Sequence, residues 1–335
     1  MSLPAAARAQ APPAPTSRAT ILGTGACMPD GVITNADLEQ LVQTSDAWIL
    51  ERTGIRERRR AGVGVTTSTM GAAAARAAMR NAGVDAVDAI IVATCSPDTF
   101  IPPASCLVQR QLGMLGVPAF DLNAACSGFV DSMIVAQGLI AGGRARTVLV
   151  IGAEALTHLV DFGDRSTCVL FGDGAGAVVL GAGDSGGIVA TAWGADGSEA
   201  DIIYYGAPPL EPDAAEGLRM AGKGTFRLAV EHMVEISREL CSSAGWTLQD
   251  VDFVVPHQAN ARIIEAVAKR VGLPMSRFAV NVDRVGNTGA ASIPLALADA
   301  DSQGALQDGA RVLMVAFGAG ATWGGLALEW TARHS

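Results

Sequence analysis

Three polar residues stand at the ends of apolar stretches, and their side chains could together act on an acyl group. Cys126 follows "FDLNAA", His257 follows "VDFVVP", and Asn287 lies in the glycine loop "VGNTGAAS". A thiolate is a nucleophile that forms covalent acyl intermediates. An imidazole and a carboxamide can donate hydrogen bonds to a developing enolate oxygen. A nucleophile with these two neutral partners predicts chemistry on a thioester.

Cys126 is distinguished by its neighbours. A cysteine among apolar residues is most often part of the core, and we interpret the other five cysteines that way. Cys126, however, begins an expected helix over 126–141, where unpaired N–H groups and the helix dipole favour a thiolate. Its small neighbours Ala124, Ala125 and Gly128 leave room for a substrate. The same N–H groups could hold an oxyanion.

His257 and Asn287 each have an ordinary structural explanation. A histidine at a strand end is more often a hydrogen-bonded structural residue than a catalyst, and asparagine beside glycine is common in turns. His257 nevertheless lies between an apolar strand and an expected helix, where a buried imidazole can donate a hydrogen bond or transfer protons. Asn287 offers two N–H donors without a charge. Each signal is weak alone, and only the combination with Cys126 points to a site.

Alternating strands and helices must position these residues. Apolar runs predict buried strands at "DAIIVATCS", "ARTVLVIGAE" and "VDFVVPHQ", with helical patterns between them. "TVLVIGAE" resembles "RVLMVAFGAG" in the second half, which predicts two similar α/β halves with a five-stranded sheet in each. We expect mostly parallel sheets, with the site at the carboxyl ends of strands.

The 335 residues fit one large domain or two fused halves. We place the nucleophile in a first half, residues 19–185, and the histidine and asparagine in a second, residues 186–335. Residues 1–18 are rich in proline and alanine and lack the apolar stretch of a signal peptide, so we expect a disordered tail.

Composition excludes several classes of protein. The net charge of −9 argues against a general nucleic-acid binder, and no run approaches the roughly 18 apolar residues of a membrane span. Six cysteines without a C-x-x-C pair and four histidines make a zinc site or a disulfide framework unexpected. Free thiols fit a reducing cytoplasm. The runs "GTGACMPDG" and "GDGAGAVVLG" lack the phosphate-loop motif, so we reject nucleotide binding.

Six segments together resemble the signature segments of the β-ketoacyl-acyl-carrier-protein synthase III family, which starts bacterial fatty-acid synthesis. They are "TSDAWILERTGIRERR", "FDLNAACSGF", "FGDGAGAVVL", "VPHQANARII", "GNTGAASIP" and "GAGATWGG". The resemblance runs from about residue 19 to 331 and implies an acyltransferase with the thiolase fold. That fold is α/β, five-layered αβαβα, built from two similar halves. It also implies a homodimer that needs no cofactor or metal beyond its coenzyme A thioester substrate.

The resemblance implies a role for each residue of the triad. Cys126 would take the starter acyl group from acyl-CoA. His257 and Asn287 would bind the thioester oxygen of malonyl-acyl-carrier protein as carbon dioxide leaves, and the carbanion would attack the acyl-cysteine. The oxyanion hole would consist of the backbone N–H groups of Cys126 and of Ala319, in "FGAGATWG". Related thiolase-fold enzymes pair the cysteine with two histidines, or with a histidine and a second cysteine or glutamate.

Coenzyme A contacts are also implied by position in the family. Trp48 and Arg165 would enclose the adenine, and Arg52 would meet the phosphates. Without the resemblance, Trp48 is interpreted as a core residue and Arg52 as a solvated charge. The pantetheine tunnel would be lined by Thr44, Met220, Gly222, Phe226, Ala259 and Asn260.

A basic patch would dock the acidic carrier protein, although its helical spacing also fits an ordinary solvated face. It comprises Arg227, Arg262, Lys269 and Arg270. Ile101 stands where some members carry a phenylalanine that reaches into the partner's acyl pocket. The smaller isoleucine would leave room for a longer or branched starter.

Two other functions stay open. Relatives of the synthase prime polyketides, join two acyl chains, or transfer acyl groups to a hydroxyl or an amine. A non-catalytic thiolase-fold subunit that binds an acyl carrier is expected to lack the nucleophile, so the complete triad argues against it.

Overall fold

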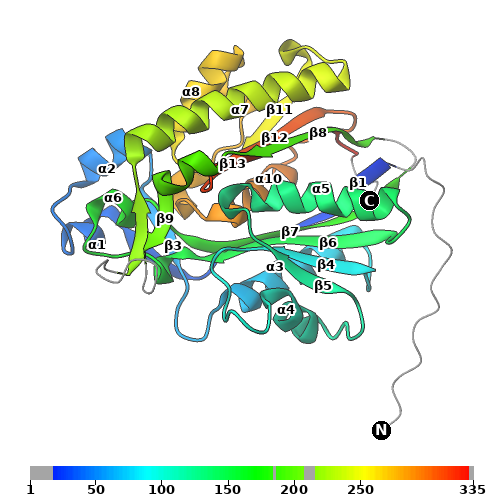
Figure 1. The fold of residues 1–335 in the computed structure, drawn as a ribbon, viewed down its shortest axis with the longest axis horizontal. Coiled ribbons are helices and arrows are strands. Elements are labelled where there is room, and N and C mark those ends of the chain that lie inside the picture. The colour runs from blue at the N-terminus through cyan, green and yellow to red at the C-terminus, as the bar shows by residue number, and fades with distance from the viewer. Residues whose placement is uncertain (1–17, 184–185, 207–215, 332–335) are drawn as a thin grey trace, which may run out of the picture.

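The chain folds into five alternating layers of helices and sheets (Figure 1), which confirms the expected αβαβα architecture. The computed structural model describes residues 18–183, 186–206 and 216–331. One sheet is covered on its outer side by α3 (Thr67–Ala82) and α4 (Ala104–Leu112). The other sheet is covered by α7 (Gly222–Ala244) and α8 (Ala261–Val271). The central layer, in contact with both sheets, is α5 (Gly128–Ala141) and α10 (Ser292–Ser302).

The two sheets share one strand order. The first has the order β1–β7–β6–β4–β5 and the second, from the matching edge, β8–β13–β12–β11. The strands of the first are β1 (Arg18–Cys27), β4 (Ala89–Ala93), β5 (Ala119–Leu122), β6 (Thr147–Ala155) and β7 (Asp173–Gly183). Those of the second are β8 (Gly187–Ala195), β11 (Phe253–Pro256), β12 (Arg311–Gly318) and β13 (Thr322–Glu329). The similar sequences of β6 and β12 therefore occupy equivalent places.

Strand directions correct one expectation. Parallel pairing is confined to β6–β4–β5 and β12–β11, whereas β1–β7–β6 and β8–β13–β12 are antiparallel. The sheets are mixed, not mostly parallel. The three residues between β12 and β13 are too few for the crossover that a parallel pair requires.

The second sheet also has four strands in the described part of the chain, where five were expected. The segment in the place of the fifth makes only an isolated parallel bridge, between Val254 and Phe278. Beyond that bridge, the side chain of Gln258 takes the segment's hydrogen bonds: its Nε2 donates to Ala279 O and its Oε1 accepts from Asn281 N–H. A side chain thus replaces the strand ladder.

The two glycine runs lie largely in strands. "GTGAC" is the end of β1 and "DGAGAVVLG" lies in β7. β1 begins at Arg18, which pairs with Gly183, so this residue belongs to the sheet and not to the expected tail. The rest of that tail, residues 1–17, lies outside the described residues.

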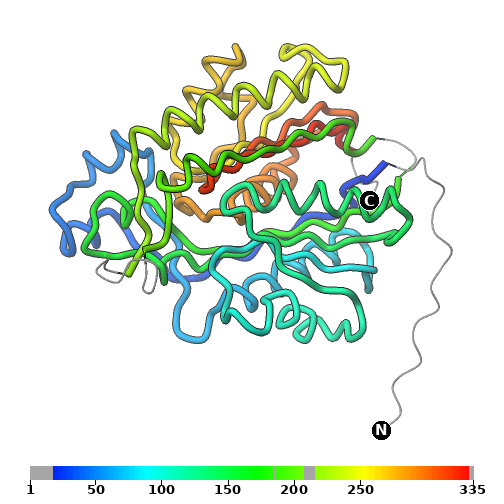
Figure 2. Tube along the Cα trace, in the orientation of Figure 1, coloured from blue at the N-terminus to red at the C-terminus, as the bar shows by residue number. Residues whose placement is uncertain are grey.

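Short elements lie together at one end of the layers. In the blue part of Figure 2, the chain leaves β1 of the first sheet and passes through α1 and α2 before it returns to that sheet at β4. These elements are β2 (Gly31–Thr34), α1 (Asn35–Glu39), α2 (Asp46–Thr53), β3 (Glu57–Arg60), α6 (Arg165–Cys168), β9 (Ile203–Gly206), β10 (Gly217–Met220) and α9 (Val282–Val285).

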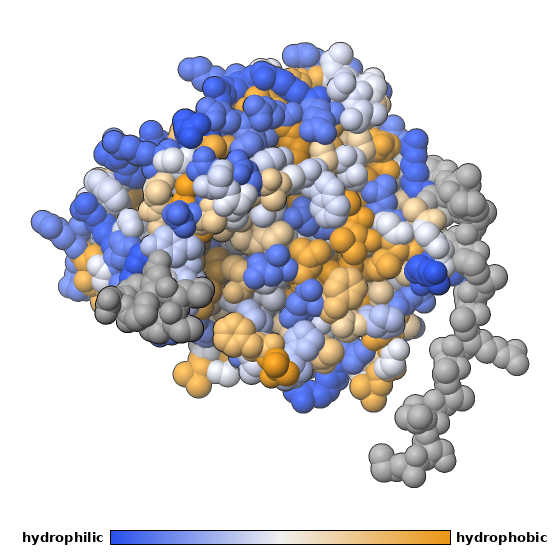
Figure 3. Space-filling view, viewed as in Figure 1, coloured by the Kyte–Doolittle hydropathy of each residue, from blue (hydrophilic) through white to orange (hydrophobic). Residues whose placement is uncertain are grey.

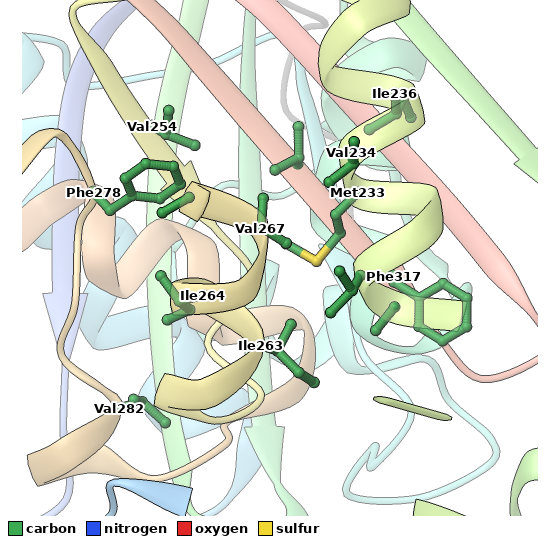
Figure 4. Packing of buried hydrophobic residues seen from close by; sticks show 14 of the residues in the cluster. Met233, Val234, Ile236, Val254, Ile263, Ile264, Val267, Phe278, Val282 and Phe317 are labelled. Atoms are coloured by element: carbon green, nitrogen blue, oxygen red, sulfur yellow. The ribbon is translucent and has the colours of Figure 1, made fainter. Parts of the chain in front are cut away.

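The largest core cluster is shared between the halves. Figure 4 shows Ile263 and Val267 of α8 between Phe278 on one side and Met233 of α7 on the other. The same cluster includes residues of α1, α2 and the α6 region, such as Leu38. The first half's short elements are therefore held by the second half's core.

Candidate active site

Cys126, His257 and Asn287 line one cavity of about 540 Å³. His257 and Asn287 are buried, with 3% and 6% of their surface exposed. The same cavity is lined by the exposed residues Arg52 and Lys223. The cavity thus joins three residues that are far apart in sequence and connects them to the surface.

Cys126 lies in a single 3-10 turn, Ala125–Ser127, directly before α5. The expected helix over 126–141 therefore begins two residues later, at Gly128. Ala125 has a φ of 47°, and its N–H donates to Asn123 Oδ1 at 3.1 Å. A Cβ on Gly318 would lie 2.7 Å from Cys126 N, so only glycine lets β12 approach the nucleophile this closely.

The environment of the sulfur acts against the expected thiolate. Burial, and secondarily the carboxyl of Glu154, raise the pKa of Cys126 to about 12. The start of α5, two residues further on, acts in the opposite direction, because its unpaired N–H groups and its dipole favour a thiolate. Burial thus favours the neutral thiol at rest.

His257 is held both at its backbone and at its ring. Its backbone N–H donates to Val315 O at 2.8 Å, and its Nδ1 lies 2.6 Å from Ser292 Oγ. Burial lowers the pKa of His257 to about 4, so the ring is neutral at physiological pH. Ser292 has no signal in the sequence beyond its place at the end of "GNTGAAS", and our prediction from the sequence did not include it.

The carboxamide of Asn287 has a fixed orientation. Its Oδ1 accepts from Gly289 N–H at 3.0 Å, which leaves the two N–H donors of Nδ2 for the cavity. The loop reaches the first half because β6 has glycine at position 152, where a Cβ would lie 2.3 Å from Ala290 O. Asn287 bridges directly to Phe171 of the first half.

The turn that carries Ala319 is tied to the nucleophile turn. Thr322 Oγ1 lies 3.0 Å from Ala319 O, from Ala124 O and from Ser127 Oγ. Ala319 itself is half-buried beside Gly318 and is not among the residues that line the cavity. One hydroxyl thus joins the two turns whose N–H groups are the predicted oxyanion hole.

Known proteins with this chemistry match the chain over most of its length. Residues 120–197 match the family model of 3-oxoacyl-[acyl-carrier-protein (ACP)] synthase III, and residues 241–330 match its C-terminal model. The beta-ketoacyl-[acyl-carrier-protein] synthase III of Roseiflexus sp. (strain RS-1) is 48% identical over 325 residues, or 94% of this chain and 99% of that protein. The chain belongs to the synthase III family.

Solved structures of this family have the same fold. The 3-oxoacyl-(acyl carrier protein) synthase III of Pseudomonas aeruginosa PAO1 is 42% identical, with a TM-score of 0.90 over 95% of this chain and 100% of that one. The priming beta-ketosynthase of the R1128 polyketide biosynthetic pathway is 36% identical, also with a TM-score of 0.90, over 96% and 99% of the two chains. These matches confirm the resemblance and the thiolase fold.

Most of the residues expected to bind coenzyme A in this synthase III line the cavity. They are Trp48, Arg52, Met220, Gly222, Phe226, Ala259 and Asn260. Thr44 and Arg165 do not line it. Arg165 instead places its guanidinium 4.7 Å from the centroid of the Trp48 ring and donates to Gln43 O at 2.9 Å.

The predicted docking residues separate into different environments. Arg262 lines the cavity and lies 5.8 Å from the ring of Phe226. Arg227 forms an ion pair with Glu231 at 2.9 Å. Lys269 and Arg270 are exposed on the last turn of α8, away from the cavity lining.

Lys223 lines the cavity, but our prediction from the sequence did not include it. Its position next to Gly222, a predicted tunnel residue, could have indicated it. Ile101 is 89% exposed and does not line the cavity of its own chain.

Three further searches cover the described residues. All six cysteines carry free thiols. In the described ranges, no group of three or more histidine, cysteine, aspartate or glutamate side chains could hold a metal ion. Among the helices in those ranges, none combines the length and apolar character of a membrane span.

Proposed function

We propose that this synthase III catalyses the decarboxylative Claisen condensation of an acyl-CoA starter with malonyl-acyl-carrier protein. The products are 3-oxoacyl-acyl-carrier protein, carbon dioxide and coenzyme A, and the reaction initiates fatty-acid synthesis. The observation that carries the proposal is the one cavity lined by Cys126, His257 and Asn287. The relatives described above are named beta-ketoacyl- or 3-oxoacyl-acyl-carrier-protein synthase III, and these names support the same reaction. The thioester supplies the activated acyl group, so the reaction requires no cofactor.

In the first step, the sulfur of Cys126 attacks the thioester carbon and coenzyme A leaves with the thiol's proton on its own sulfur. Since the thiol is neutral at rest, it loses its proton only as the reaction proceeds. The N–H groups of Cys126 and Ala319 are proposed to hold the oxyanion, because Thr322 ties their turns together.

In the second step, malonyl-acyl-carrier protein occupies the emptied tunnel. Its thioester oxygen accepts hydrogen bonds from His257 and from Nδ2 of Asn287, whose Oδ1 is already bound to Gly289 N–H. As the bond between the α-carbon and the carboxylate breaks, carbon dioxide leaves. The electron pair of that bond stays on the thioester fragment and forms an enolate. The enolate carbon attacks the acyl carbon on Cys126, and the cysteine sulfur leaves as a thiolate that takes a proton from water. Neutral donors suit this step because they stabilise the developing charge at little cost when it is absent.

Coenzyme A is proposed to enter past Trp48 and Arg165, with its phosphates near Arg52 and the newly found Lys223. Arg165 must swing away from Trp48 to admit an adenine, because a gap of 4.7 Å cannot hold a ring between them. The remaining tunnel contacts stay those proposed from the family: Thr44, Met220, Gly222, Phe226, Ala259 and Asn260.

The acidic carrier protein is proposed to dock on α7 and α8 at the cavity mouth. Arg262 is the best placed, because it lines the cavity and is exposed. The other proposed contacts are Arg227, Lys269 and Arg270. At net charge −9, a local basic patch would steer an acidic partner to this face.

A homodimer in the cytoplasm completes the proposal. Phe100 and Ile101 are 98% and 89% exposed, and β5 is an edge strand on which Phe120 is exposed. Figure 3 shows apolar surface around the position of α5, whereas the face over α7 and α8 is mostly polar. An apolar edge of this kind fits a subunit interface, from which Ile101 would reach the partner's acyl pocket. We also propose the halves 19–185 and 186–335 as the duplicated units.

A second candidate is the priming of a polyketide or another acyl transfer in secondary metabolism. It is favoured by the likeness to the priming beta-ketosynthase at 36% identity. A non-catalytic carrier-binding subunit is disfavoured, because the complete triad lines one cavity.

Intact mass spectrometry after mixing the protein with a panel of acyl-CoAs tests the first step. We expect one acyl adduct on the wild type and on Cys106→Ala, a half-buried cysteine outside the cavity, and none on Cys126→Ala. No adduct at all would support the binding subunit. Labelled malonyl-acyl-carrier protein then tests condensation: an acyl-enzyme that extends no malonyl unit would support the second candidate.

The variant I101F is expected to shift the starter preference toward acetyl, and an unchanged preference would refute the role of Ile101.

A further inference from the structure

The hydroxyl of Ser292 contacts the proposed catalytic histidine on the nitrogen that faces away from substrate. Ser292 is the first residue of α10 and is fully buried. Its Oγ lies 2.6 Å from Nδ1 of His257. Because Ser292 does not line the cavity, Nε2 is the ring nitrogen left to meet substrate.

The remaining contacts of this oxygen decide which atom donates. The backbone N–H of Gln258 also points at Ser292 Oγ, at 3.4 Å, and an N–H can only donate. A buried hydroxyl is stabilised when its own proton has an acceptor. Within the described ranges, Nδ1 of His257 is the acceptor that its contacts provide. If Nδ1 carried a proton, two N–H groups would meet one oxygen and the hydroxyl proton would have no partner.

We infer that the Ser292 hydroxyl donates to His257 Nδ1 and holds the imidazole in the tautomer with its proton on Nε2. Ser292 is thus a positioning residue for the condensation step. The position of α10 agrees with this, because the partial positive charge at a helix start disfavours a second proton on the ring.

The tautomer has consequences for both steps, and this part rests on the proposed function. With the proton on Nε2, His257 donates to the thioester oxygen beside Nδ2 of Asn287, so two fixed donors meet the enolate oxygen. The same proton prevents Nε2 from taking the proton of Cys126. Ser292 therefore matters for decarboxylation and condensation and much less for transfer of the acyl group to the thiol.

Nitrogen NMR of the full-length protein labelled with ¹⁵N-histidine tests the tautomer without substrate. The chain has four histidines, and the His257 signals are assigned by their loss in His257→Gln. In the wild type we expect Nε2 in the protonated range and Nδ1 in the unprotonated range of a neutral ring, and in Ser292→Ala a shift away from this pattern. The opposite assignment in the wild type, or an unchanged spectrum in Ser292→Ala, would overturn the inference.

Kinetics of the separate steps test the consequence. In Ser292→Ala we expect malonyl decarboxylation and condensation to fall about 10-fold or more, while formation of the acyl-cysteine stays within about 3-fold of wild type. Ser132→Ala is the matched control, because Ser132 is also fully buried and its hydroxyl has no partner among the described residues. It should leave both steps unchanged. Equal losses in both steps of Ser292→Ala, or similar losses in Ser132→Ala, would contradict a positioning role.

The two proposals fail in different ways. If the wild type forms no acyl-cysteine but its Nε2 is protonated, the proposed function is wrong and the tautomer stands. If the wild type is acylated and condenses while Nδ1 is the protonated nitrogen, the inference about Ser292 is wrong and the function stands.

Discussion

The two halves bury different kinds of polar group. In the described ranges, every buried carboxylate belongs to the first half: Asp131, Glu154 and Asp173. The second half buries neutral groups, including His257, Gln258, Asn281 and Asn287. Glu154 acts on the thiol, because its carboxyl helps to raise the pKa of Cys126. Of the neutral groups, His257 and Asn287 line the cavity in which the proposed reaction forms negative charge. The duplicated fold therefore provides two electrostatic environments at one cavity.

Equivalent loops show this difference most clearly. β4 and β11 occupy the same place in their sheets. After β4, the carboxylate of Glu154 accepts from the N–H groups of Cys95 and Ser96, both at 3.1 Å, and from the Ser96 hydroxyl. After β11, the amide of Gln258 both donates and accepts. Glu154 meets donors from the loop after β4. Gln258, in the loop after β11, meets two carbonyl oxygens and one N–H, which belong to β11 and to the segment at 279–281.

Gln258→Glu is expected to have the largest effect of the substitutions that test this comparison. Gln258 Nε2 donates to Pro256 O at 2.9 Å and to Ala279 O at 3.0 Å. A carboxylate would place negative charge against both oxygens in a fully buried site. We expect a loss of about 3 kcal/mol in the free energy of unfolding, measured by urea denaturation at pH 8. The exposed Gln249→Glu is the control, and equal stability of the two variants would refute the comparison.

Asp131→Asn is expected to stabilise the protein, and the effect depends on pH. Burial raises the pKa of Asp131 to about 6 from 3.8. The folded state therefore binds this proton more tightly, so wild-type stability falls as the pH rises from about 4 to about 6 and stays lower above it. Asparagine removes that loss, which gives a gain of about 2 kcal/mol at pH 7.5 and almost none near pH 4. Thermal unfolding at both pH values measures it, with the exposed Asp85→Asn as control. A gain that does not depend on pH would contradict this explanation.

Glu154→Gln reverses the change made in Gln258→Glu. The new amide would turn N–H groups toward a loop that offers mainly donors, among them Thr94 Oγ1 at 3.1 Å. We expect a loss of about 1–2 kcal/mol, smaller than for Gln258→Glu because no buried charge is created. Chemical denaturation beside the exposed Glu239→Gln measures it. A larger loss than in Gln258→Glu would mean that burial alone, and not the direction of the donors, decides both effects.

The sequence points to Cys126 and His257 because each follows a strand, β5 or β11, whose end can be read locally. Asn287 follows the helix α9 and not a strand, so its local sign is the glycine loop. The sequence predicts the five layers through the family resemblance. It does not predict Ser292, because a serine at a helix start is common and its contact with His257 depends on how α10 packs beneath β11. Gln258 likewise gives no local sign that its amide replaces a strand ladder. Nor does the sequence predict the surroundings that distant segments place around Cys126, which raise the pKa of its thiol against the expected thiolate.

Thr322 is the point where the two halves are joined beside the reacting sulfur. Its hydroxyl contacts Ala124 O in the first half and Ala319 O in the second. Valine has nearly the same shape but cannot make these contacts, so Thr322→Val should leave the fold intact and loosen the predicted oxyanion hole. We expect kcat/KM for acyl transfer to fall about 10-fold, with the melting temperature close to that of the control Thr191→Val on the exposed face of β8. Ser127 keeps a second partner in Asp131 at 3.1 Å, so a loss in Thr322→Val would report on the link between the halves and not on collapse of the nucleophile turn. Full activity would mean that Gly318 and the packing of β12 hold the two turns together without the hydroxyl.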